Sequence, residues 1–251
     1  MTTRPVKDLF STQSDLYAKY RPTYPPELYE YILRFVRNRE AAWDCATGNG
    51  QVARVLASHF KKVFATDISE NQLRHAATAE NIAYSLSPAE KTPFADDSFD
   101  LVTVGQAYHW LDATAFCREA ARVARPDAIV AIWGYVSGKP AHDVDKLLHR
   151  WNYDVLSSYW EPERKHVHAR YETLPFDFEI VGKRDIRIVV EWNFDELMGH
   201  MRTWSAHQNM LRQAGDAAFL KMTQEMRNAW TDGTTKPFAF DVFMKVGRVR
   251  K

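Results

Sequence analysis

A glycine turn between two apolar runs constrains the fold of this chain more than any other feature of its sequence. The segment AAWDCATGNGQVARVL begins at Ala41, has Gly48 and Gly50 in its turn and ends at Leu56. The apolar run before the turn is typical of a buried strand, and the apolar residues after it recur at helical spacing. A strand, a tight turn and a helix direct backbone N–H groups toward a bound group. The segment therefore predicts a strand–turn–helix unit that binds a ligand.

Further apolar runs alternate with helical patterns along the first half of the chain. Helical spacing begins at Pro25, and Ser69 with Gln72 forms a capping box for a helix that we expect to reach about Ala79. Asp112 caps another expected helix. Short apolar runs predict strands at 62–67, 82–86, 99–104 and 128–135. Strands that alternate with helices imply right-handed crossovers and a parallel sheet covered on both faces.

The second half of the chain has a different pattern. Apolar and polar side chains alternate in 184–192 and 237–249, which predicts an antiparallel pair of strands with a less buried face. Helical spacing lies between them at 194–201 and 219–230. An aromatic-rich stretch precedes them and is expected to form a helical cap. The expected organisation is one domain with three parts, namely a cofactor-binding core with an N-terminal lid segment (1–136), a cap insertion (137–182) and a C-terminal completion of the sheet (183–251).

The composition excludes several classes of protein. With 45% hydrophobic residues and a net charge of +1, the chain has an ordinary core and no electrostatic footprint for nucleic acid or an anionic membrane. We find neither a transmembrane-length apolar stretch nor a signal-peptide core, and expect a cytoplasmic protein. Cys45 and Cys117 are expected to be reduced core thiols. His166 and His168 lack a third ligand, so no metal site is expected.

Two cofactor classes fit the glycine turn. The sequence GNGQVA matches the G-x-G-x-x-A pattern of dinucleotide-binding turns. Asp67 lies 67 − 50 = 17 residues past the last glycine, where a carboxylate accepts hydrogen bonds from ribose hydroxyls. This placement suits NAD and S-adenosylmethionine equally. Asp44, just before the turn, favours S-adenosylmethionine, because a carboxylate repels a pyrophosphate but suits an amino-acid moiety. Its alternative role is to cap the following helix.

Several motifs, taken in their order, resemble those of the class I S-adenosylmethionine-dependent methyltransferases. They are WDCATGNGQ, FATDIS, SPAEKTPFADDSFDLVTV and QAYHWLD. Within that class the chain resembles the small-molecule group that includes the trans-aconitate methyltransferases, whose pattern also has segments like YAKYRPTYP and RTWSA. The resemblance covers most of the chain. It implies an α/β fold with a Rossmann-like seven-stranded sheet, mostly parallel, with an antiparallel C-terminal strand and a helical cap insertion.

The same resemblance implies roles for the residues around the turn. Gly48 lets the turn approach the methionine part of S-adenosylmethionine, Asp67 binds the ribose, and Ile68 packs on the adenine. Arg21 is expected to bind the methionine carboxylate through a two-pronged contact, with a solvated charge at a helix end as the alternative. The complete set of expected cofactor residues is Arg21, Asp44, Ala46, Gly48, Gly50, Asp67, Ile68, Ala89, Glu90, Gln106 and Ala107.

Two positions depart from the pattern of the family. Ala46 stands where the family has its first motif glycine, so the turn must accommodate a methyl group. Pro88 stands where the family often has an aspartate, before Ala89 and Glu90. This proline removes a carboxylate and a backbone donor, so the adenine contacts are expected to come from Ala89, Glu90 and Ile68.

The methyl acceptor is expected to bind after the fourth strand. His109 is the only histidine beside the predicted cleft and is the candidate catalytic base, with a packing or positioning role as the alternative. Aromatic rings there are expected to face the cofactor cation or to pack in the core. The candidate acceptor residues are Tyr17, Tyr108, Trp110 and Arg202.

The predicted reaction is O-methylation of a small carboxylic acid, because the resemblance is to acid-methylating enzymes and an ionised acid needs no base. Candidate cationic anchors for such an acid are Arg202 and a cap group, Arg164, Lys165, His166 and Arg170, for which a solvated charge run is the alternative. Three other readings stay open. They are methylation of a phenol, a quinol or another metabolite with His109 as base, a cofactor-binding protein without catalysis, and an NAD-dependent dehydrogenase.

Overall fold

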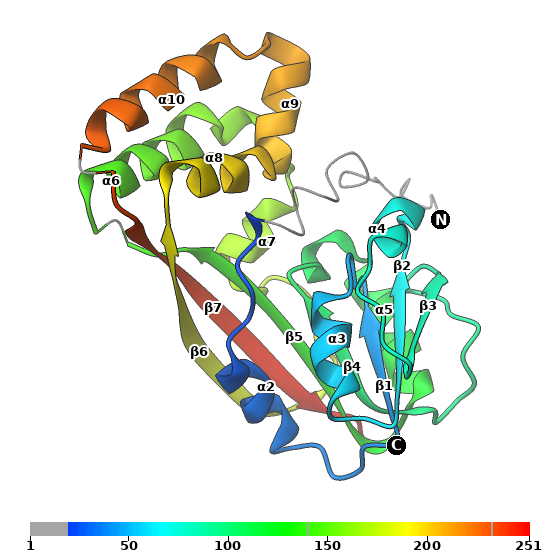
Figure 1. Ribbon diagram of the computed structural model, residues 1–251. Helices are drawn as coiled ribbons and strands as arrows, with labels where there is room; N and C mark the ends of the chain where they lie inside the picture. Colours follow the sequence, from blue (N-terminus) through cyan, green and yellow to red (C-terminus); the bar gives the residue numbers. More distant parts are fainter. Residues whose placement is uncertain (1–19, 140, 232) are drawn as a thin grey trace.

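A seven-stranded sheet forms the centre of the structure, a computed structural model that describes residues 20–139, 141–231 and 233–251. The strand order is β3-β2-β1-β4-β5-β7-β6 (Figure 1). Neighbours from β3 to β5 pair in parallel, whereas β7 lies antiparallel between β5 and β6. This confirms the predicted fold class. The strands are β1 (Ala41–Cys45), β2 (Lys62–Asp67), β3 (Ile82–Leu86), β4 (Phe99–Gly105), β5 (Ala124–Ser137), β6 (Glu179–Trp192) and β7 (Lys236–Arg248).

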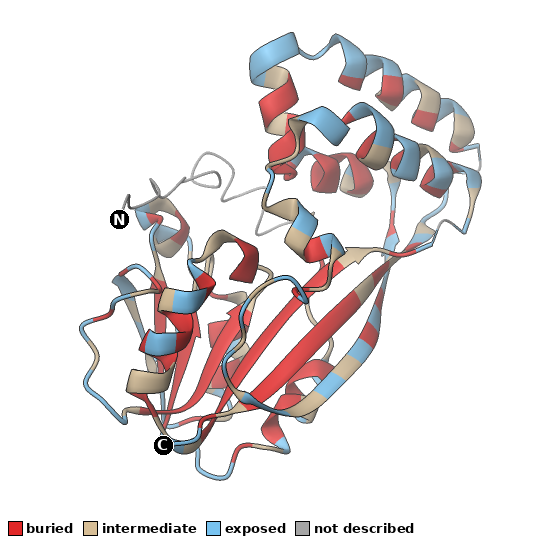
Figure 2. Ribbon diagram, turned by 180° about the vertical axis from the view of Figure 1, so that it is seen from behind, coloured by how far each residue is buried: buried red, intermediate tan, exposed pale blue. Residues whose placement is uncertain are grey.

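Helices cover both faces of the sheet and enclose two hydrophobic cores. On one face lie α2 (Pro26–Leu33) and α3 (Gln51–Ala57), and on the other lies α5 (Ala113–Val123) (Figure 1). Adjacent residues of β1 point to opposite faces, so Ala42 packs in the first core and Trp43 in the second. The central strands are therefore buried on both faces (Figure 2). Their continuous apolar runs follow from this burial.

A lobe of helices stands beyond the carboxyl ends of β5 and β6 (Figure 1). Its helices are α6 (Asp143–Arg150), α8 (Phe194–Arg202), α9 (Ser205–Ala214) and α10 (Ala217–Ala229). Between α6 and β6 the chain forms a π-helix (Trp151–Val155), a 3-10 helix (Ser157–Tyr159) and α7 (Arg164–His168). The expected cap at 137–182 supplies only part of this lobe, and its last residues already belong to β6. The spacing of apolar residues predicted α8 and α10 as helices, but it does not show that α10 packs against α6.

The helix expected from Ser69 to about Ala79 is shorter in the structure. Helix α4 spans Glu70–Arg74, and the Ser69 side chain accepts a hydrogen bond from the Gln72 N–H, as predicted for its cap. The segment after it is held by contacts to other elements. The Ala77 N–H donates to the Asn49 carbonyl at 3.1 Å. The Tyr84 hydroxyl donates to the Ala77 carbonyl at 2.6 Å. These bonds hold Ala77 outside a helical conformation.

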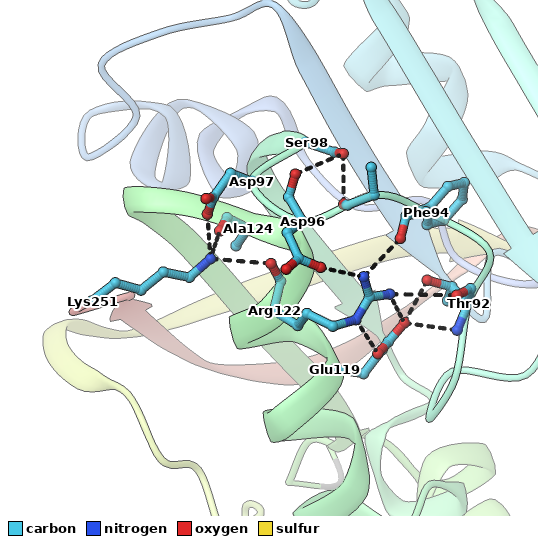
Figure 3. Close-up of polar contacts among 10 residues, drawn as sticks. Thr92, Phe94, Asp96, Asp97, Ser98, Glu119, Arg122, Ala124 and Lys251 are labelled. Carbon is cyan, nitrogen blue, oxygen red and sulfur yellow. Dashed lines mark hydrogen bonds and ion pairs between the residues drawn. The ribbon is translucent and has the colours of Figure 1, made fainter.

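An ion-pair network fixes the chain before β4 (Figure 3). It includes the C-terminal residue, and the C-terminus lies at the end of the sheet opposite the helical lobe (Figure 1). The Arg122 guanidinium of α5 contacts the carboxylates of Glu119 and Asp96, each at 2.7 Å. The Glu119 carboxylate also accepts hydrogen bonds from the Thr92 N–H and hydroxyl, at 2.7 and 2.6 Å. The Lys251 side chain pairs with Asp97 beside it. This network is structural and lies away from the candidate site.

Candidate active site

The glycine turn after β1 contains three residues with left-handed backbone. Their φ angles are +53° at Ala46, +56° at Gly48 and +78° at Gly50, which is the N-cap of α3. The Thr47 N–H donates to the Thr66 carbonyl at 2.9 Å, which joins the turn to β2. Ala46, the departure from the family pattern, therefore occupies a conformation that costs a residue with a Cβ about 1 kcal/mol.

The two glycines of the turn have different surroundings. A Cβ at Gly50 would overlap the Tyr84 hydroxyl, whereas a Cβ at Gly48 would have the Gln72 Oε1 atom, 3.9 Å away, as its nearest neighbour. Gly50 is thus required by packing within the protein. Among the described residues, a Cβ at Gly48 would make only this ordinary van der Waals contact, so the packing there does not exclude the approach of a bound group.

Asp44 holds the turn from inside the protein. Its side chain is buried, and its carboxylate accepts hydrogen bonds from the hydroxyls of Thr47 at 2.5 Å and Thr103 at 2.7 Å. Burial raises the pKa of Asp44 to about 6, against the opposing effect of these hydroxyls and of the Ala53 backbone. Because Ala53 lies in the first turn of α3, this geometry matches the helix-capping alternative. A contact from Asp44 to the cofactor stays a prediction.

Asp67 and Ile68 lie at the carboxyl end of β2, next to the turn. The Asp67 carboxylate accepts hydrogen bonds from the Gly48 N–H at 2.8 Å and from the Ser69 N–H at 2.9 Å. Ile68 is 41% exposed, although it is a large apolar side chain. A carboxylate at the turn beside an exposed apolar surface fits the predicted binding of a ribose and a flat base.

The remaining predicted cofactor residues are placed around the ends of β3 and β4. Ala89 is buried, and the Glu90 carboxylate accepts a hydrogen bond from the Asp112 N–H at 3.0 Å. Gln106 has a φ of +55°, and its side chain bonds both backbone groups of Tyr135. Gln106 thereby continues the pairing of β4 with β5 beyond the last ladder residues. Ala107 follows it and is half-buried.

His109 is buried in a short 3-10 helix (Tyr108–Trp110) after β4. Its Nδ1 atom lies 3.2 Å from the Tyr171 hydroxyl, and its ring lies 4.5 Å from that of Trp110 between centroids. Burial, then the positive charge of Arg164, lowers the pKa of His109 to about 3. A histidine with this pKa is neutral at pH 7 and is a weak base.

Tyr108 does not line the cleft, which corrects one expectation. Its side chain is fully buried, and its hydroxyl donates to the Pro175 carbonyl. The ring packs against Phe116 and Tyr171, with centroids 5.7 and 5.5 Å apart. The core-packing alternative therefore describes Tyr108. Trp110 remains half-buried beside His109, and Tyr17 lies outside the described residues.

Arg21 lies at the carboxyl end of β5, where it joins the sheet to the helical lobe. Its Nη1 atom donates to the Tyr135 hydroxyl at 2.8 Å. Its Nη2 atom donates to the Thr203 carbonyl, after α8, at 3.1 Å. These two bonds fix the plane of the guanidinium at the end of the sheet where ligands bind in parallel α/β folds.

A second guanidinium, that of Arg164 in α7, lies in the same region. Its carbon atom is 3.4 Å from the centroid of the Trp160 ring, and its Nη2 atom donates to the Asn152 Oδ1 atom at 3.4 Å. Burial, and to a smaller extent the charge of Arg21, lowers the pKa of Arg164 to about 10, so it stays protonated at pH 7. Within 20–139, 141–231 and 233–251, no carboxylate forms an ion pair with Arg164.

The other predicted cationic anchors lie elsewhere. The Arg202 guanidinium is 5.3 Å from the centroid of the Phe219 ring, within the helical lobe. Arg170 pairs with Asp185 of β6 at the protein surface. Of the arginines Arg164, Arg170 and Arg202, Arg164 is therefore the one placed beside Arg21.

Sequence reasoning did not find Thr103, Tyr135 or Asn152. Thr103 and Tyr135 lie near the carboxyl ends of β4 and β5, and that position is a signal that was available. Asn152 lies in the π-helix, an element that is frequent at functional sites but has no sequence signature. Its side-chain nitrogen is buried, and no acceptor for it is present among the described residues.

Comparison with known proteins places this chain in a family. The model of a family described as a methyltransferase domain matches residues 43–132. A protein of Dictyostelium discoideum named as a methyltransferase is 31% identical over 235 residues, which are 91% of this chain and 89% of that protein. A solved structure from Anaeromyxobacter dehalogenans, described as a type II methyltransferase, is 33% identical with a TM-score of 0.83, and the match covers 92% of this chain and 99% of that one. This chain belongs to the methyltransferase family.

Membership of this family decides between the two cofactor classes. The protein is an S-adenosylmethionine-dependent methyltransferase, and the dehydrogenase reading is wrong. The site fits that cofactor, because Gly48 has no close neighbour among the described residues, Asp67 places a carboxylate at the turn and Ile68 is an exposed apolar side chain. S-adenosylmethionine supplies a methyl group that is already activated on a sulfonium. Of the helices in the described ranges, none has the length and apolarity to cross a membrane.

Proposed function

We propose that this methyltransferase transfers the methyl group to a carboxylate oxygen of a small acid, as the trans-aconitate methyltransferases that it resembles do. The observation that carries the proposal is Arg164, a partly buried guanidinium beside Arg21 that has no ion pair with a described carboxylate. A guanidinium presents a planar fork that matches a carboxylate. Arg21 holds the methionine carboxylate of the cofactor, and Arg164 holds the carboxylate of the acceptor.

The state of His109 supports the same acceptor class. A carboxylate is ionised at pH 7 and gives up no proton when its oxygen is methylated. A phenol or a quinol needs a base, and His109, with its pKa lowered to about 3 by burial and Arg164, is a weak one. The task of the protein is then to hold the acceptor oxygen in line with the methyl group. His109 contributes by packing against Tyr171 and Trp110.

The acceptor in this proposal is a free small molecule of the cytoplasm. With a net charge of +1, the chain has no overall excess of basic residues of the kind that favours a nucleic acid or an anionic membrane. The aromatic side chains of the lobe near Arg164, such as Trp160, suit an acceptor with an apolar part next to its carboxylate.

An acceptor panel tests the proposal. Trans-aconitate, simple mono- and dicarboxylic acids, a phenol, a quinol and an amine are each incubated with S-adenosylmethionine, and S-adenosylhomocysteine release is measured. We expect turnover of at least one acid, and Arg164→Gln should raise its KM about tenfold or more, as loss of a charged hydrogen bond does. Arg170→Gln, a surface arginine of the same segment, is the control. Turnover of a phenol or quinol but of no acid, abolished by His109→Ala, contradicts the proposal.

A further inference from the structure

One hydrogen-bonded pair in the helical lobe, His200 and Trp204, is connected to both guanidinium groups. The Trp204 Nε1–H donates to the His200 Nε2 atom at 3.1 Å. The ring proton of His200 therefore lies on Nδ1, which donates to the Tyr20 carbonyl at 3.2 Å. Both side chains are buried. This pair thus holds His200 as one neutral tautomer with both ring nitrogens bonded.

The connection to Arg21 runs through the backbone on both sides of the pair. Tyr20, whose carbonyl His200 holds, is the residue before Arg21. Gly199 makes room for the Tyr20 ring, because a Cβ at Gly199 would lie 2.6 Å from that ring. Thr203, the residue before Trp204, accepts the hydrogen bond of Arg21 at 3.1 Å. The end of α8 thereby fixes Arg21 through its preceding peptide and through its guanidinium.

The connection to Arg164 runs through aromatic rings. The Trp204 ring lies 5.8 Å from the Trp160 ring between centroids, at 42°. The Arg164 guanidinium lies over the Trp160 ring, 3.4 Å from its centroid. The indole that bonds His200 therefore also supports the ring on which Arg164 is stacked. A cation held over an indole face is restricted in direction.

We infer that the His200–Trp204 pair is a positioning unit that orients Arg21 for the cofactor carboxylate and Arg164 for the acceptor carboxylate. Neither side chain touches a reacting atom in this scheme. The part that concerns the acceptor rests on the proposed function, whereas the part that concerns Arg21 requires only cofactor binding. Burial and the charge of Arg21 hold the pKa of His200 well below its usual range, which keeps its Nε2 atom able to accept from Trp204.

Two variants and one control isolate the unit. Trp204→Phe keeps an aromatic ring and removes the N–H that bonds His200. His200→Asn keeps a donor near the position of Nδ1 and removes the acceptor at Nε2. His207→Asn is the matched control, because His207 is also a buried histidine of the lobe but packs against Phe219, with ring centroids 4.2 Å apart. The folding of each variant is compared through its thermal unfolding midpoint.

The readout is the binding of two probes by calorimetry. S-adenosylhomocysteine has the amino-acid carboxylate that Arg21 is expected to hold, and 5′-methylthioadenosine lacks it. We expect Trp204→Phe and His200→Asn to weaken S-adenosylhomocysteine about tenfold and to change 5′-methylthioadenosine less than about twofold, as misplacement of one charged hydrogen bond does. His207→Asn should leave both affinities unchanged. If Trp204→Phe lowers the unfolding midpoint below that of the control, the inference is judged on the two probe affinities of His200→Asn.

Two results overturn the inference. One is an unchanged affinity for S-adenosylhomocysteine in both variants, and the other is an equal loss for both probes. With the best acid of the panel, the variants should also raise its KM several-fold more than they lower kcat. If no acid is turned over, the proposed function fails, whereas the ratio of the two probe affinities still decides the role of the pair toward Arg21.

Discussion

Gly50 and Tyr84 share one space in the structure, since a Cβ at Gly50 would overlap the Tyr84 hydroxyl. That hydroxyl is fixed by its bond to the Ala77 carbonyl at 2.6 Å. The pairing explains why the glycine turn, the end of α4 and β3 are held as one unit. It also distinguishes the two glycines of the turn, because Gly48 has a left-handed backbone too, but a Cβ there would make only an ordinary contact with Gln72 among the described residues.

Alanine at the two glycines should therefore have unequal costs. Gly48→Ala should lower the free energy of unfolding by about 1 kcal/mol, the cost of a Cβ on left-handed backbone. Gly50→Ala should lower it by about 2 to 4 kcal/mol, because overpacking against Tyr84 is added. Urea denaturation measures both values. The double variant Gly50→Ala/Tyr84→Ala should lose the coupling, and equal costs for the two single variants would show that Tyr84 does not restrict Gly50.

Removal of the Asp67 carboxylate should weaken cofactor binding. Asp67→Ala is expected to reduce the affinity for S-adenosylhomocysteine by about 1 to 3 kcal/mol, since the ribose hydroxyls lose a charged acceptor. Asp67 also accepts from the Gly48 and Ser69 N–H groups, so Asp67→Asn, which keeps one acceptor, should bind with intermediate affinity. Calorimetry gives the three affinities. Unchanged binding by Asp67→Ala would place Asp67 outside the cofactor site.

Stability should fall on acidification below about pH 6.5, the usual histidine pKa. Burial lowers the pKa of His109 to about 3 and that of His207 to about 4 in the folded protein. Because the unfolded chain binds more protons below pH 6.5, stability is fully present above that pH and is lost as pH falls. Each histidine should cost roughly 2 kcal/mol at pH 5.

Asp44 changes the free energy of unfolding in the opposite direction and reduces the net loss of stability on acidification. Its pKa is raised to about 6 by burial, so its contribution is present at low pH and is lost as pH rises through 6. At pH 5 Asp44 should contribute about 1 kcal/mol more to the free energy of unfolding than at pH 6.5. Unfolding free energies of the wild type and His207→Gln, measured from pH 5 to 7, test the balance. A slope that His207→Gln leaves unchanged would contradict this account.

His109 should be dispensable for the chemical step with an acid acceptor. His109→Gln is expected to keep kcat within about tenfold of the wild type, since no proton is transferred. The pH profile of kcat should then show no acidic limb that His109→Gln abolishes, because an essential base would be inactivated by protonation at low pH. A loss of three or more orders of magnitude, of the kind produced by removal of a catalytic base, would assign His109 to proton transfer.

The sequence predicted the sheet because its signals are local. The apolar run of β1, the glycines after it and the alternation along β6 and β7 are each readable within a few residues. The end of α4 was predicted wrongly, because the bonds that hold Ala77 come from Asn49 and Tyr84. The helical lobe was only partly predicted, since packing of α6 on α10 joins segments that are far apart in the sequence.

The candidate site divides in the same way. Gly48, Gly50 and Asp67 belong to a local pattern, and the structure brings all three together. The local sequence does not predict that Arg164 and Arg170 have different environments. Arg164 stacks on Trp160, whereas Arg170 pairs with Asp185. Tyr108 was misplaced for a related reason. Its neighbourhood depends on Pro175 and Tyr171, which the sequence alone does not bring to it.

The central claim is that the methyl group becomes bonded to a carboxylate oxygen. The most direct measurement uses S-adenosylmethionine labelled in its methyl group, with the acid that the panel identifies, followed by mild alkaline treatment of the purified product. A methyl ester is cleaved by alkali, so the account predicts that the label is recovered as volatile methanol and that the starting acid is regenerated. A label that stays with the product after alkali, as in an ether, an amine or a carbon-methylated compound, would contradict the account.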